Sequence, residues 1–596
     1  MDIHQTMGVY AYTSIINILL KGNNMKNNLC NIDQLKARLM KLGECKILED
    51  CTSSEEYKTE RLVFNRKFTF RPTAIIFVTN TEQVQEVVKC ANELHVHLTV
   101  RSGGHDHEGE CSATDSWLLD FSKMNAIISS KGGTVLGECE KIESESEDLR
   151  VMIEPGARFE KIKKAMDSHN LGIPHGTCQT VGIAGYTMGG GWGPWTRKYG
   201  MACEHLVAAT IVLGDGTKVE LSDQDAPDSN KGQLLWALRG GGGLSYGIVT
   251  QFVFKPFVLP KLSFNFSINA LKFFPNTNTL DVLKIWEKAI EPEHNPHLIG
   301  TNLKIVAKKA AVIDPCAQLE CIMNGYFGGT LLELGEMICD WYNICQPEKP
   351  ISTDTLLAWI KDKANQGITV YAQTFPQENG LEAGISHVKW PFHSWDRAKI
   401  SKSGILEINL DPDCPAPHKI TSRLANPEWN DSSRKALICS LQSPLLPSHD
   451  EGNNNSDIDF GFDTFITLGA ITGKYYAQYD DKNTLGSAFP YKKQLFTIQY
   501  QAWWNQPARD DDGYCDETAG AEQKLKNREF SNRVEDWIEK CRDYFIDHTD
   551  GAFISFKDAS VPTETYFSQN YQDLINIKLK YSKDKNFLFK TRKTIL

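Results

Sequence analysis

The sequence lacks several features that would have assigned it to a class at once. It has no apolar run of membrane-spanning length, so we expect no membrane helix. Its first residues carry no positively charged leader. The apolar segment 9–20 shows no clear small-residue cleavage site, so it is interpreted as an ordinary N-terminal element, with a trimmed signal as the alternative. The net charge of −11 leaves no basic excess, which argues against a nucleic-acid binder.

Metal and dinucleotide signatures are also missing. The 16 cysteines do not form the paired C-x-x-C spacing of a zinc site, so no metal is expected. Neighbouring cysteines such as Cys316 and Cys321 are compatible with a disulfide or with two free thiols. No G-x-G-x-x-G opens an early helix with an acid about twenty residues on, which argues against a nicotinamide-dependent Rossmann enzyme. No internal repeat is present.

The chain is too long for one core, since 596 residues predict two or three domains. After a polar N-terminal stretch, residues 74–78 are typical of a buried strand. Thr81 is expected to cap a helix over 82–91, and residues 97–100 predict a second strand. This strand leads directly into a glycine-rich turn. The order predicts an α/β unit that presents a ligand site at the end of a strand.

Two glycine-rich stretches each carry one reactive side chain. The first is Arg-Ser-Gly-Gly-His-Asp, with His105, and the second is Gly-Thr-Cys-Gln-Thr-Val-Gly, with Cys178. Glycine lets the main chain approach a ligand closely, and successive N–H groups form an anion-binding concavity. An imidazole and a thiol on two such turns predict a phosphate-bearing cofactor held at two points. Taken singly, a histidine in such a turn is more often an ordinary polar contact, and a buried cysteine is more often an inert packed thiol.

Four motifs in order resemble the berberine-bridge-enzyme-like flavin oxidases of the vanillyl-alcohol-oxidase-type (PCMH-type) FAD-binding superfamily. They are RSGGHD, GTCQTVGIAGYTMGGGWGPWTRKYGM, RGGGGLSYGIVT and YFSQNYQDLINIKLKYSKDKNF. The resemblance implies an α+β fold. It consists of a two-lobed FAD-binding domain made of two α/β subdomains, and a substrate domain whose antiparallel sheet is backed by helices. The implied division is an N-terminal extension (1–62), the FAD-binding domain (63–257), the substrate-binding domain (258–545) and a C-terminal segment returning to the FAD-binding domain (546–596).

The same resemblance implies FAD bound covalently at two positions. His105 would bond to the 8α-methyl group of the flavin and Cys178 to carbon 6. Thiolate and imidazole are suited to this chemistry because both are good nucleophiles, and such bonds alter the electronics of the cofactor. The other implied cofactor-binding residues are Arg101, Ser102, Gly103, Gly104, Asp106, Val181, Gly182, Gly185, Tyr186, Gly189, Gly190, Gly247, Val249 and Asn570.

Three positions bear on how closely the chain follows that family. Tyr186 stands where the family commonly has histidine, and it is expected to donate a hydrogen bond to the ribityl or ring carbonyl region. Phe553 and Phe556 occupy the place of a tyrosine-rich motif, so a tyrosinate base there is in doubt. Val181 falls at the family's oxygen gate, where valine goes with oxidases, although plain packing is the alternative.

The activity implied is hydride transfer from a C–H that bears a hydroxyl to the flavin, with a base taking the hydroxyl proton and dioxygen becoming hydrogen peroxide. Candidate catalytic residues are Tyr500, Gln499 and Trp192, and Gln501 falls on the same strand. Tyr500 has an ordinary pKa near 10, so it would need a neighbouring donor or cation to act as base, and a packed aromatic is the alternative. Trp192, Trp503 and Trp504 would suit stacking on a sugar ring, or would belong to the core.

The substrate implied is an oligosaccharide or, second, a bulky secondary-metabolite alcohol. Partners are therefore a small molecule and dioxygen, with no nucleic acid or membrane, in a monomer or weak oligomer. The compartment stays unknown, with the secretory pathway slightly favoured by the resemblance. Two alternatives remain: a flavin dehydrogenase of the same fold that uses another acceptor, and a flavin-binding protein that has lost catalysis.

Overall fold

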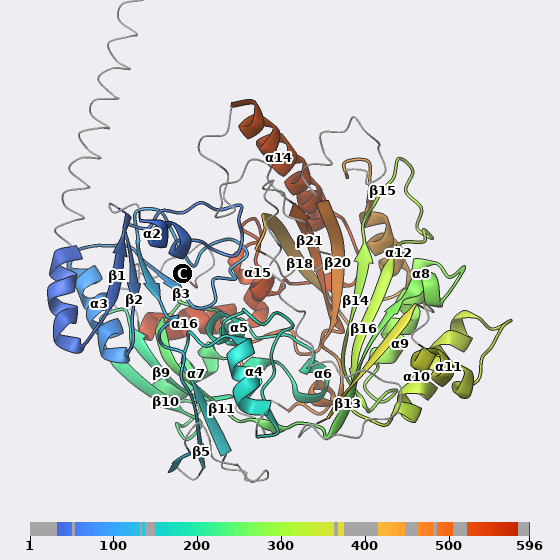
Figure 1. Ribbon diagram of the computed structural model, residues 1–596, viewed down its shortest axis with the longest axis horizontal. Coiled ribbons are helices and arrows are strands. Elements are labelled where there is room, and N and C mark those ends of the chain that lie inside the picture. The colour runs from blue at the N-terminus through green and yellow to red at the C-terminus, as the bar shows by residue number, and fades with distance from the viewer. Residues whose placement is uncertain are drawn as a thin grey trace, which may run out of the picture.

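The fold is described from a computed structural model of the chain (Figure 1). The ranges that the structure describes are 32–50, 54–131, 134–136, 149–167, 169–362, 367–374, 415–446, 462–480, 486–504, 521–581 and residue 595. The apolar segment 9–20 lies outside them. Among the helices in these ranges, none is both long and apolar enough to cross a membrane.

The first sheet has four strands and carries His105 at one of its ends. Three strands are parallel, and the N-terminal strand joins them antiparallel at the edge. Helix α3 (Thr81–Glu93) is capped by the side chain of Asn80, which accepts from the backbone N–H of Gln83; Thr81, expected as the cap, is the first helical residue. In sheet order the strands are β1 (Lys46–Glu49), β2 (Ala74–Phe77), β4 (Trp117–Asp120) and β3 (Leu98–Arg101).

Residues 32–60 belong to this sheet and its core, although the sequence placed them in an extension. Ile32, Leu35 and Leu39 recur at helical spacing and are buried in the core beneath the sheet. Strand β1 pairs with β2, and α2 (Glu55–Glu60) buries Tyr57, whose hydroxyl donates to the carbonyl of Pro72. The polar composition of the segment hid its few apolar positions, which are the ones that pack. The preceding residues, 1–31, lie outside the described ranges.

The second sheet has six antiparallel strands and underlies the first. Its core includes residues of α4 (Phe159–Asp167), α7 (Asn230–Leu238) and the C-terminal α16 (Tyr571–Tyr581). Thus Leu574 and Ile577, from the last helix, pack with strands from the first half of the chain. In sheet order the strands are β10 (Lys218–Ser222), β9 (Leu206–Leu213), β11 (Gly247–Phe254), β7 (Leu149–Ile153), β5 (Ile127–Lys131) and β6 (Thr134–Leu136).

The third sheet has eight antiparallel strands and forms the other half of the molecule (Figure 1). Its strands in order are β17 (Ile368–Thr374), β13 (Leu262–Asn269), β16 (Cys321–Phe327), β14 (Leu298–Val306), β20 (Phe462–Ala470), β21 (Phe496–Trp504), β18 (His418–Ala425) and β22 (Thr549–Asp550). Helices on one face are α9 (Thr279–Ile290), α10 (Leu331–Cys345), α11 (Thr353–Asp362), α12 (Asp431–Ser440) and α14 (Ala521–Asp543).

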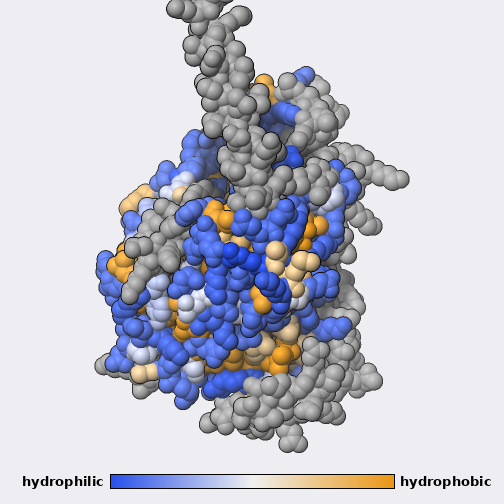
Figure 2. All heavy atoms as spheres, turned by 90° about the vertical axis from the view of Figure 1, so that its left-hand side faces the viewer, coloured by the Kyte–Doolittle hydropathy of each residue, from blue (hydrophilic) through white to orange (hydrophobic). Residues whose placement is uncertain are grey.

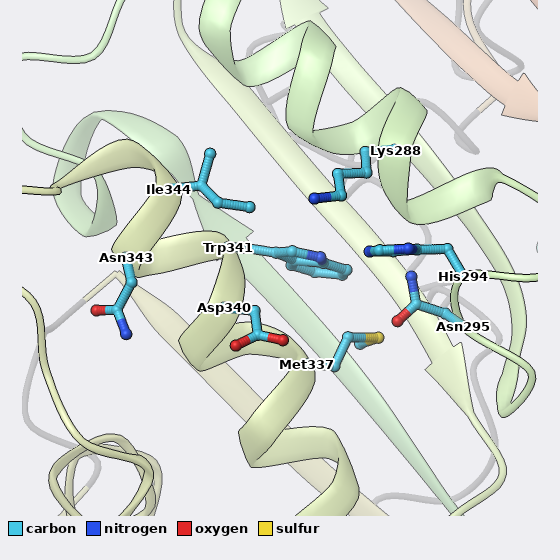
Figure 3. Close-up of a pocket in the computed structure, with 8 residues that line it drawn as sticks. All are labelled: Lys288, His294, Asn295, Met337, Asp340, Trp341, Asn343 and Ile344. Atoms are coloured by element: carbon cyan, nitrogen blue, oxygen red, sulfur yellow. The ribbon is translucent and has the colours of Figure 1, made fainter.

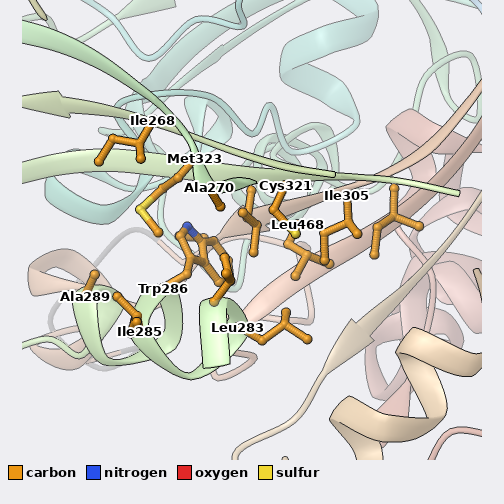
Figure 4. Packing of buried hydrophobic residues seen from close by; sticks show 14 of the residues in the cluster. Ile268, Ala270, Leu283, Ile285, Trp286, Ala289, Ile305, Cys321, Met323 and Leu468 are labelled. Atoms are coloured by element: carbon orange, nitrogen blue, oxygen red, sulfur yellow. The ribbon is translucent and has the colours of Figure 1, made fainter. Parts of the chain in front are cut away.

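Side chains alternate between the two faces of this sheet, which separates a core from a polar face. Figure 4 shows Trp286 of α9 packed between Met323 and Leu468 of the sheet, with its indole N–H donating to Thr301 Oγ1 at 3.1 Å. The opposite face receives contacts from the half that holds His105. The antiparallel sheet backed by helices agrees with the expected α+β class.

Shorter elements connect these layers. They are η1 (Met40–Leu42), β8 (Leu171–Gly172), α5 (Ile183–Met188), α6 (Thr196–Tyr199), η3 (Ala202–His205), β12 (Phe257–Val258), α8 (Ala270–Phe273), β15 (Lys308–Lys309), β19 (Gln442–Ser443), α13 (Lys474–Ala477), η5 (Ile554–Phe556), α15 (Thr563–Phe567) and η6 (Ser568–Asn570). Figure 2 shows the end of the molecule formed by the first two sheets, where hydrophilic side chains predominate over small, separated apolar groups.

Candidate functional site

His105 and Cys178 lie together in the structure, as the two glycine-rich turns predict. His105 follows the end of β3, and Cys178 lies in the turn between β8 and α5. The hydroxyl of Thr180 lies 2.7 Å from His105 Nε2 and 3.5 Å from Cys178 Sγ. Burial lowers the pKa of His105 well below its usual value near 6.5, with the charges of His107 and Arg158 adding to the effect. The imidazole is therefore neutral at pH 7 and keeps a lone pair for bonding.

The two turns cross with their backbones in direct contact at a pair of glycines. A Cβ on Gly103 would lie 2.4 Å from the backbone nitrogen of Gly182. A Cβ on Gly182 would lie 2.0 Å from Ser102 Oγ and 2.5 Å from the backbone nitrogen of Gly103. Real Cβ atoms do not approach other atoms so closely, so both positions require glycine. This crossing holds the imidazole and the thiol in one place.

Polar anchors fix the first turn beneath this crossing. Arg101 is buried and donates from Nε to Asp120 at 2.6 Å and from one terminal nitrogen to the carbonyl of Leu62 at 3.1 Å. Ser102 Oγ donates to the carbonyl of Pro155 at 2.5 Å. Gly104 takes a positive φ of 76° over the Arg101 side chain. Each of the four residues before His105 thus makes a contact that helps to fix the turn.

An ion cluster follows His105 and joins the two halves of the molecule. Lys557, near the C-terminus, contacts Asp106 at 2.7 Å and Glu110 at 3.0 Å. Lys419 of β18 contacts Glu108 at 2.7 Å and Asp558 at 2.8 Å, and all three of these side chains are buried. Asp106 also accepts from the backbone N–H groups of Glu108 and Glu110. The His105 turn is therefore tied to the third sheet and to the C-terminal segment.

Lys419→Met is expected to destabilise the protein by about 3–5 kcal/mol, because it removes the buried cation that Glu108 and Asp558 share. It leaves Asp558 with its contact to Arg542 at 3.2 Å. The loss should be largest near pH 7 and should shrink as the pH falls toward about 4. In the wild type, burial opposes ionisation of Asp558, but Lys419 and several hydrogen bonds lower its pKa overall, so its stabilisation is lost only in acid. In Lys419→Met the burial of Asp558 is no longer offset by Lys419, so protonation of Asp558 in acid should relieve part of the destabilisation.

Thermal unfolding of Lys419→Met between pH 4 and 8 measures this effect. Lys526→Met is the matched control, since Lys526 forms an exposed i,i+4 pair with Glu522 on α14 and should change stability little. Equal unfolding temperatures of the two variants at pH 7 would show that the ion cluster of Lys419 does not hold the two halves of the molecule together.

Tyr500 lies on the side of β21 away from His105, which corrects its assignment as a candidate base. Its side chain is fully buried among the helices of the third sheet, and its hydroxyl lies 2.7 Å from Ser440 Oγ. Burial raises its pKa above the usual value near 10. Strand alternation puts Gln499 and Gln501 on the opposite face instead. Within the described ranges, the side-chain amide of Gln499 has no hydrogen-bond partner.

Trp192 rests on that same face of the sheet. Its indole N–H donates to the carbonyl of Ala470 at 2.8 Å, and its ring covers Gly469, where a Cβ would lie 2.7 Å from it. Trp503 and Trp504 belong to the packed interior, so the idea that they stack on a sugar does not hold. Trp504 lies in the helix-side core, and Trp503 stacks on His418 with 4.1 Å between ring centroids.

Tyr186 makes a different contact from the one expected of it. Its hydroxyl donates to the backbone carbonyl of Trp192 at 2.8 Å, and burial raises its pKa well above 10. It also packs edge to face on Phe159, with centroids 4.7 Å apart. Tyr186 therefore shapes the loop that carries Trp192, where a histidine in the family would offer a ring nitrogen.

The remaining implied cofactor residues divide into two groups. A Cβ on Gly185 would meet nothing within 4 Å, which leaves open space beside α5. Gly189 instead lies against Ser555, and Gly190 lies against Phe489 and Phe553, so these glycines accommodate protein neighbours. Gly247, Val249 and Asn570 also contact protein neighbours. A Cβ on Gly247 would meet the carbonyl of Val212, and Val249 packs in the core of the second sheet. Asn570 donates to the carbonyl of Ala488.

The residues present fit an FAD bound through two bonds. The 8α-methyl and carbon 6 belong to the same benzenoid ring of the flavin, so their attachment atoms must converge on one place. The side chains of His105 and Cys178 do converge, because the hydroxyl of Thr180 contacts both of them. Cys178 forms no disulfide, and neither does any other cysteine in the described ranges, including Cys316 and Cys321. No group of side chains within those ranges is suited to hold a metal ion.

One histidine at this site was missed from the sequence. His107 follows His105 by two residues and lies 3.0 Å from His418 of β18, ring nitrogen to ring nitrogen. Its closeness to His105 in the chain was a usable signal. Its partner is 311 residues away, and no sequence pattern joins the two.

A pocket of about 390 Å³ lies elsewhere, between α9 and α10 (Figure 3). Lys288, His294 and Asp340 surround the ring of Trp341 there. Those helices cover the face of the third sheet that points away from His105, so this pocket is separate from the site described above.

Comparison with known proteins supports the flavin interpretation. Residues 72–222 match the FAD binding domain family. The xylooligosaccharide oxidase of Thermothelomyces thermophilus is 30% identical over 246 residues, a match that covers 41% of this chain and only 45% of that protein. Berberine bridge enzyme-like 19 of Arabidopsis thaliana is 23% identical over 531 residues, covering 86% of this chain and 77% of that protein.

A solved structure shares the whole fold. The glucooligosaccharide oxidase of Acremonium strictum, described with a 6-S-cysteinyl, 8α-N1-histidyl FAD, superposes with a TM-score of 0.63 at 19% identity. The superposition covers 94% of this chain and 98% of that one. With the ordered motifs and the converging histidine and cysteine, these likenesses support an FAD-dependent oxidoreductase that is similar to the berberine-bridge-enzyme-like proteins and shares the fold of the oligosaccharide oxidases.

Proposed function

We propose that this chain is an oxidase that holds FAD covalently through His105 and Cys178 and oxidises an oligosaccharide at a carbon that bears a hydroxyl, with dioxygen reduced to hydrogen peroxide. The observation that carries the proposal is the convergence of His105 Nε2 and Cys178 Sγ on one hydroxyl, at 2.7 and 3.5 Å. A histidine or cysteine placed for packing alone would have no reason to share that position with the other.

When bound, FAD supplies a two-electron acceptor for the hydride and a donor of those electrons to dioxygen. The protein supplies the groups that bind the cofactor and hold it against the substrate side. The crossing at Gly103 and Gly182 fixes the two turns against each other, and glycine-rich turns of this kind can offer backbone N–H groups to a phosphate-bearing ligand. The ion cluster of Lys419 and Lys557 holds the His105 turn against the third sheet, which presents the substrate side.

The sheet face near Trp192 favours a sugar over an apolar alcohol. Asn302, Lys304, Thr467 and Gln499 lie on this face by strand alternation, so it is rich in hydrogen-bonding groups. Lys304 contacts Asp463 at 3.2 Å and lies 3.8 Å from the centroid of the Phe465 ring. Amides, hydroxyls and one ammonium group are suited to bind the hydroxyl groups of an oligosaccharide.

The test is anaerobic reduction of the purified protein by cellobiose, xylobiose and chitobiose, each followed by admission of air. We expect at least one disaccharide to bleach the flavin and air to restore its colour rapidly, with one peroxide formed per turnover. Slow recovery in air would indicate a dehydrogenase with another acceptor. Failure of every disaccharide and of a wider alcohol panel to bleach the flavin would indicate a protein that has lost catalysis.

Val181→Leu is expected to slow reoxidation by roughly tenfold or more, which corresponds to ~1.4 kcal/mol, while leaving anaerobic reduction nearly unchanged. Val181 lies in the turn of Cys178 and is partly buried against the core of the second sheet. A larger side chain there would narrow the approach of dioxygen. The two half-reactions are measured separately by stopped flow, with Val181→Ala as the control of opposite size. Equal reoxidation rates in all three proteins would leave Val181 a packing residue.

A further inference from the structure

Two histidines from distant parts of the chain form a hydrogen-bonded pair beside the His105 turn. His107 Nδ1 lies 3.0 Å from His418 Nε2, and His418 Nδ1 lies 2.9 Å from the backbone carbonyl oxygen of Ala416. His418 is fully buried, whereas His107 is only partly covered. The pair joins the turn of the FAD-binding half to the first residue of β18.

The proton positions in this pair follow from the carbonyl. A carbonyl oxygen only accepts, so His418 Nδ1 must carry a hydrogen. Neutral His418 then has a lone pair at Nε2, which can only accept. His107 must therefore donate from Nδ1, and its own lone pair is left at Nε2. Within the described residues, no group hydrogen-bonds to His107 Nε2, so this lone pair is available to a ligand.

The rings around the pair hold it rigidly. Trp503 stacks on His418 at 4.1 Å between centroids, and Phe64 stacks on His105 at 3.9 Å while meeting His418 edge-on at 5.8 Å. Phe556 lies 6.2 Å from His107, ring centroid to ring centroid. Phe556 belongs to the segment where the family has its tyrosine-rich motif. The imidazole thus lies next to the place where a phenol is missing.

The charged and titratable groups that face the pair come from each neighbouring element. His105 and Asp106 belong to the same turn, Lys557 to the C-terminal segment, and Lys67 to the segment that precedes β2. Burial lowers the pKa of His107 to about 4, with Asp106 opposing this effect and Lys557 adding to it. Burial and the charge of His107 lower the pKa of His418. Both imidazoles are therefore neutral near pH 7, which is the protonation state used above to place their hydrogens.

We propose that His107 is the base of this site, that it accepts the substrate hydroxyl proton at Nε2, and that His418 is the positioning residue that fixes its tautomer. This rests on the proposed oxidation of a CH–OH group. The O–H bond breaks and its proton goes to His107 Nε2. The C–H bond breaks and its electron pair leaves with the hydrogen as hydride to the bound FAD, and the carbon–oxygen double bond forms. The imidazolium, stabilised by Asp106, returns its proton to solvent after product release.

The pH dependence of anaerobic reduction separates this base from a phenol. The rate should be constant above about pH 5 and should fall as the pH drops through the His107 pKa of about 4, because protonation removes the lone pair. A tyrosine with an ordinary pKa near 10 would instead give a rate that rises through the neutral and alkaline range. A rise of that kind would overturn the assignment.

The matched variants are His107→Asn and His418→Asn. Asparagine at 107 can keep a donor near the Nδ1 position and loses only the base, so anaerobic reduction should slow by about 10²- to 10⁴-fold while the flavin stays attached. Asparagine at 418 can still donate to Ala416 but offers no ring acceptor, and it should cause a smaller loss. Added imidazole should restore part of the rate in His107→Ala. His294→Asn, exposed and remote, is the control.

A second measurement does not depend on turnover. Diethyl pyrocarbonate modifies neutral imidazole, and peptide mass spectrometry assigns the site. At pH 5, His107 should react faster than exposed His294, because its pKa of about 4 keeps the His107 imidazole neutral there. His418→Asn should reduce this preference. If the wild type is bleached by a disaccharide and His107→Asn is bleached equally fast, His107 is not the base. If no substrate bleaches the wild type, the proposed function fails, whereas the reactivity of His107 still reports on its lone pair.

Discussion

The His105→Ala, Cys178→Ala double variant is expected to release all of its yellow pigment on acid precipitation, whereas each single variant keeps the pigment in the pellet. Each side chain would provide one covalent bond, and one bond is enough to survive denaturation. The distances of 2.7 and 3.5 Å to the shared Thr180 hydroxyl show that the His105 and Cys178 side chains reach the same place. Absorbance of supernatant and pellet after precipitation measures the outcome.

The single variants should also differ from the wild type in their chemistry. Loss of either bond removes one electronic perturbation of the flavin, so its reduction potential should fall and substrate reduction should slow. Cys316→Ala and His294→Ala are the controls, since both residues are exposed and remote from the turns. Release of pigment from one single variant, with full retention by the other, would mean that only one bond exists.

Gly182→Ala is expected to abolish flavin incorporation and to lower the stability of the FAD-binding half by about 1–3 kcal/mol or more. The added Cβ would lie 2.0 Å from Ser102 Oγ and 2.5 Å from the backbone nitrogen of Gly103, and a backbone atom cannot move aside cheaply. Gly182 has an ordinary φ of −84°, so the effect comes from space and not from backbone strain.

Gly185→Ala is the matched control for the effect of Gly182→Ala on stability. It lies three residues later, in α5, and its added Cβ would meet nothing within 4 Å. Alanine in a helix is also favoured over glycine by about 0.5–1 kcal/mol, so thermal stability should be unchanged or raised. Flavin absorbance per protein and the unfolding temperature are compared for both variants. A stable, yellow Gly182→Ala protein would contradict the crossing of the two turns.

Much of the site could be predicted from short sequence motifs. The pairing of His105 with Cys178 was predictable because each lies in a short glycine-rich motif, and glycine at 103 and 182 is required by direct backbone contact. The assignment of Tyr500 was wrong because one position along a strand exchanges the two faces, and the sequence FTIQYQAWW does not say which face is polar. Gln499 and Gln501, its neighbours, are the residues that face the site.

Other parts depended on contacts that no local pattern contains. His107 meets His418 across 311 residues, and Lys419 meets Glu108 across the same separation. Strand β1 was hidden because its segment is polar overall, while only its few apolar residues pack. The glycines at 189 and 190 were predicted to approach the cofactor, yet their close neighbours come from the C-terminal segment and from Phe489. Long-range topology, which fixes these contacts, emerges only when the sheets assemble.

The central claim is that one FAD is bonded to both His105 and Cys178, and peptide mass spectrometry tests it most directly. Trypsin should cut after Arg101, Lys123, Lys164 and Arg197, so His105 and Cys178 fall in peptides 102–123 and 165–197. We predict a single yellow species whose mass equals the two peptides joined through one flavin. Recovery of both peptides without flavin from yellow protein would contradict the account.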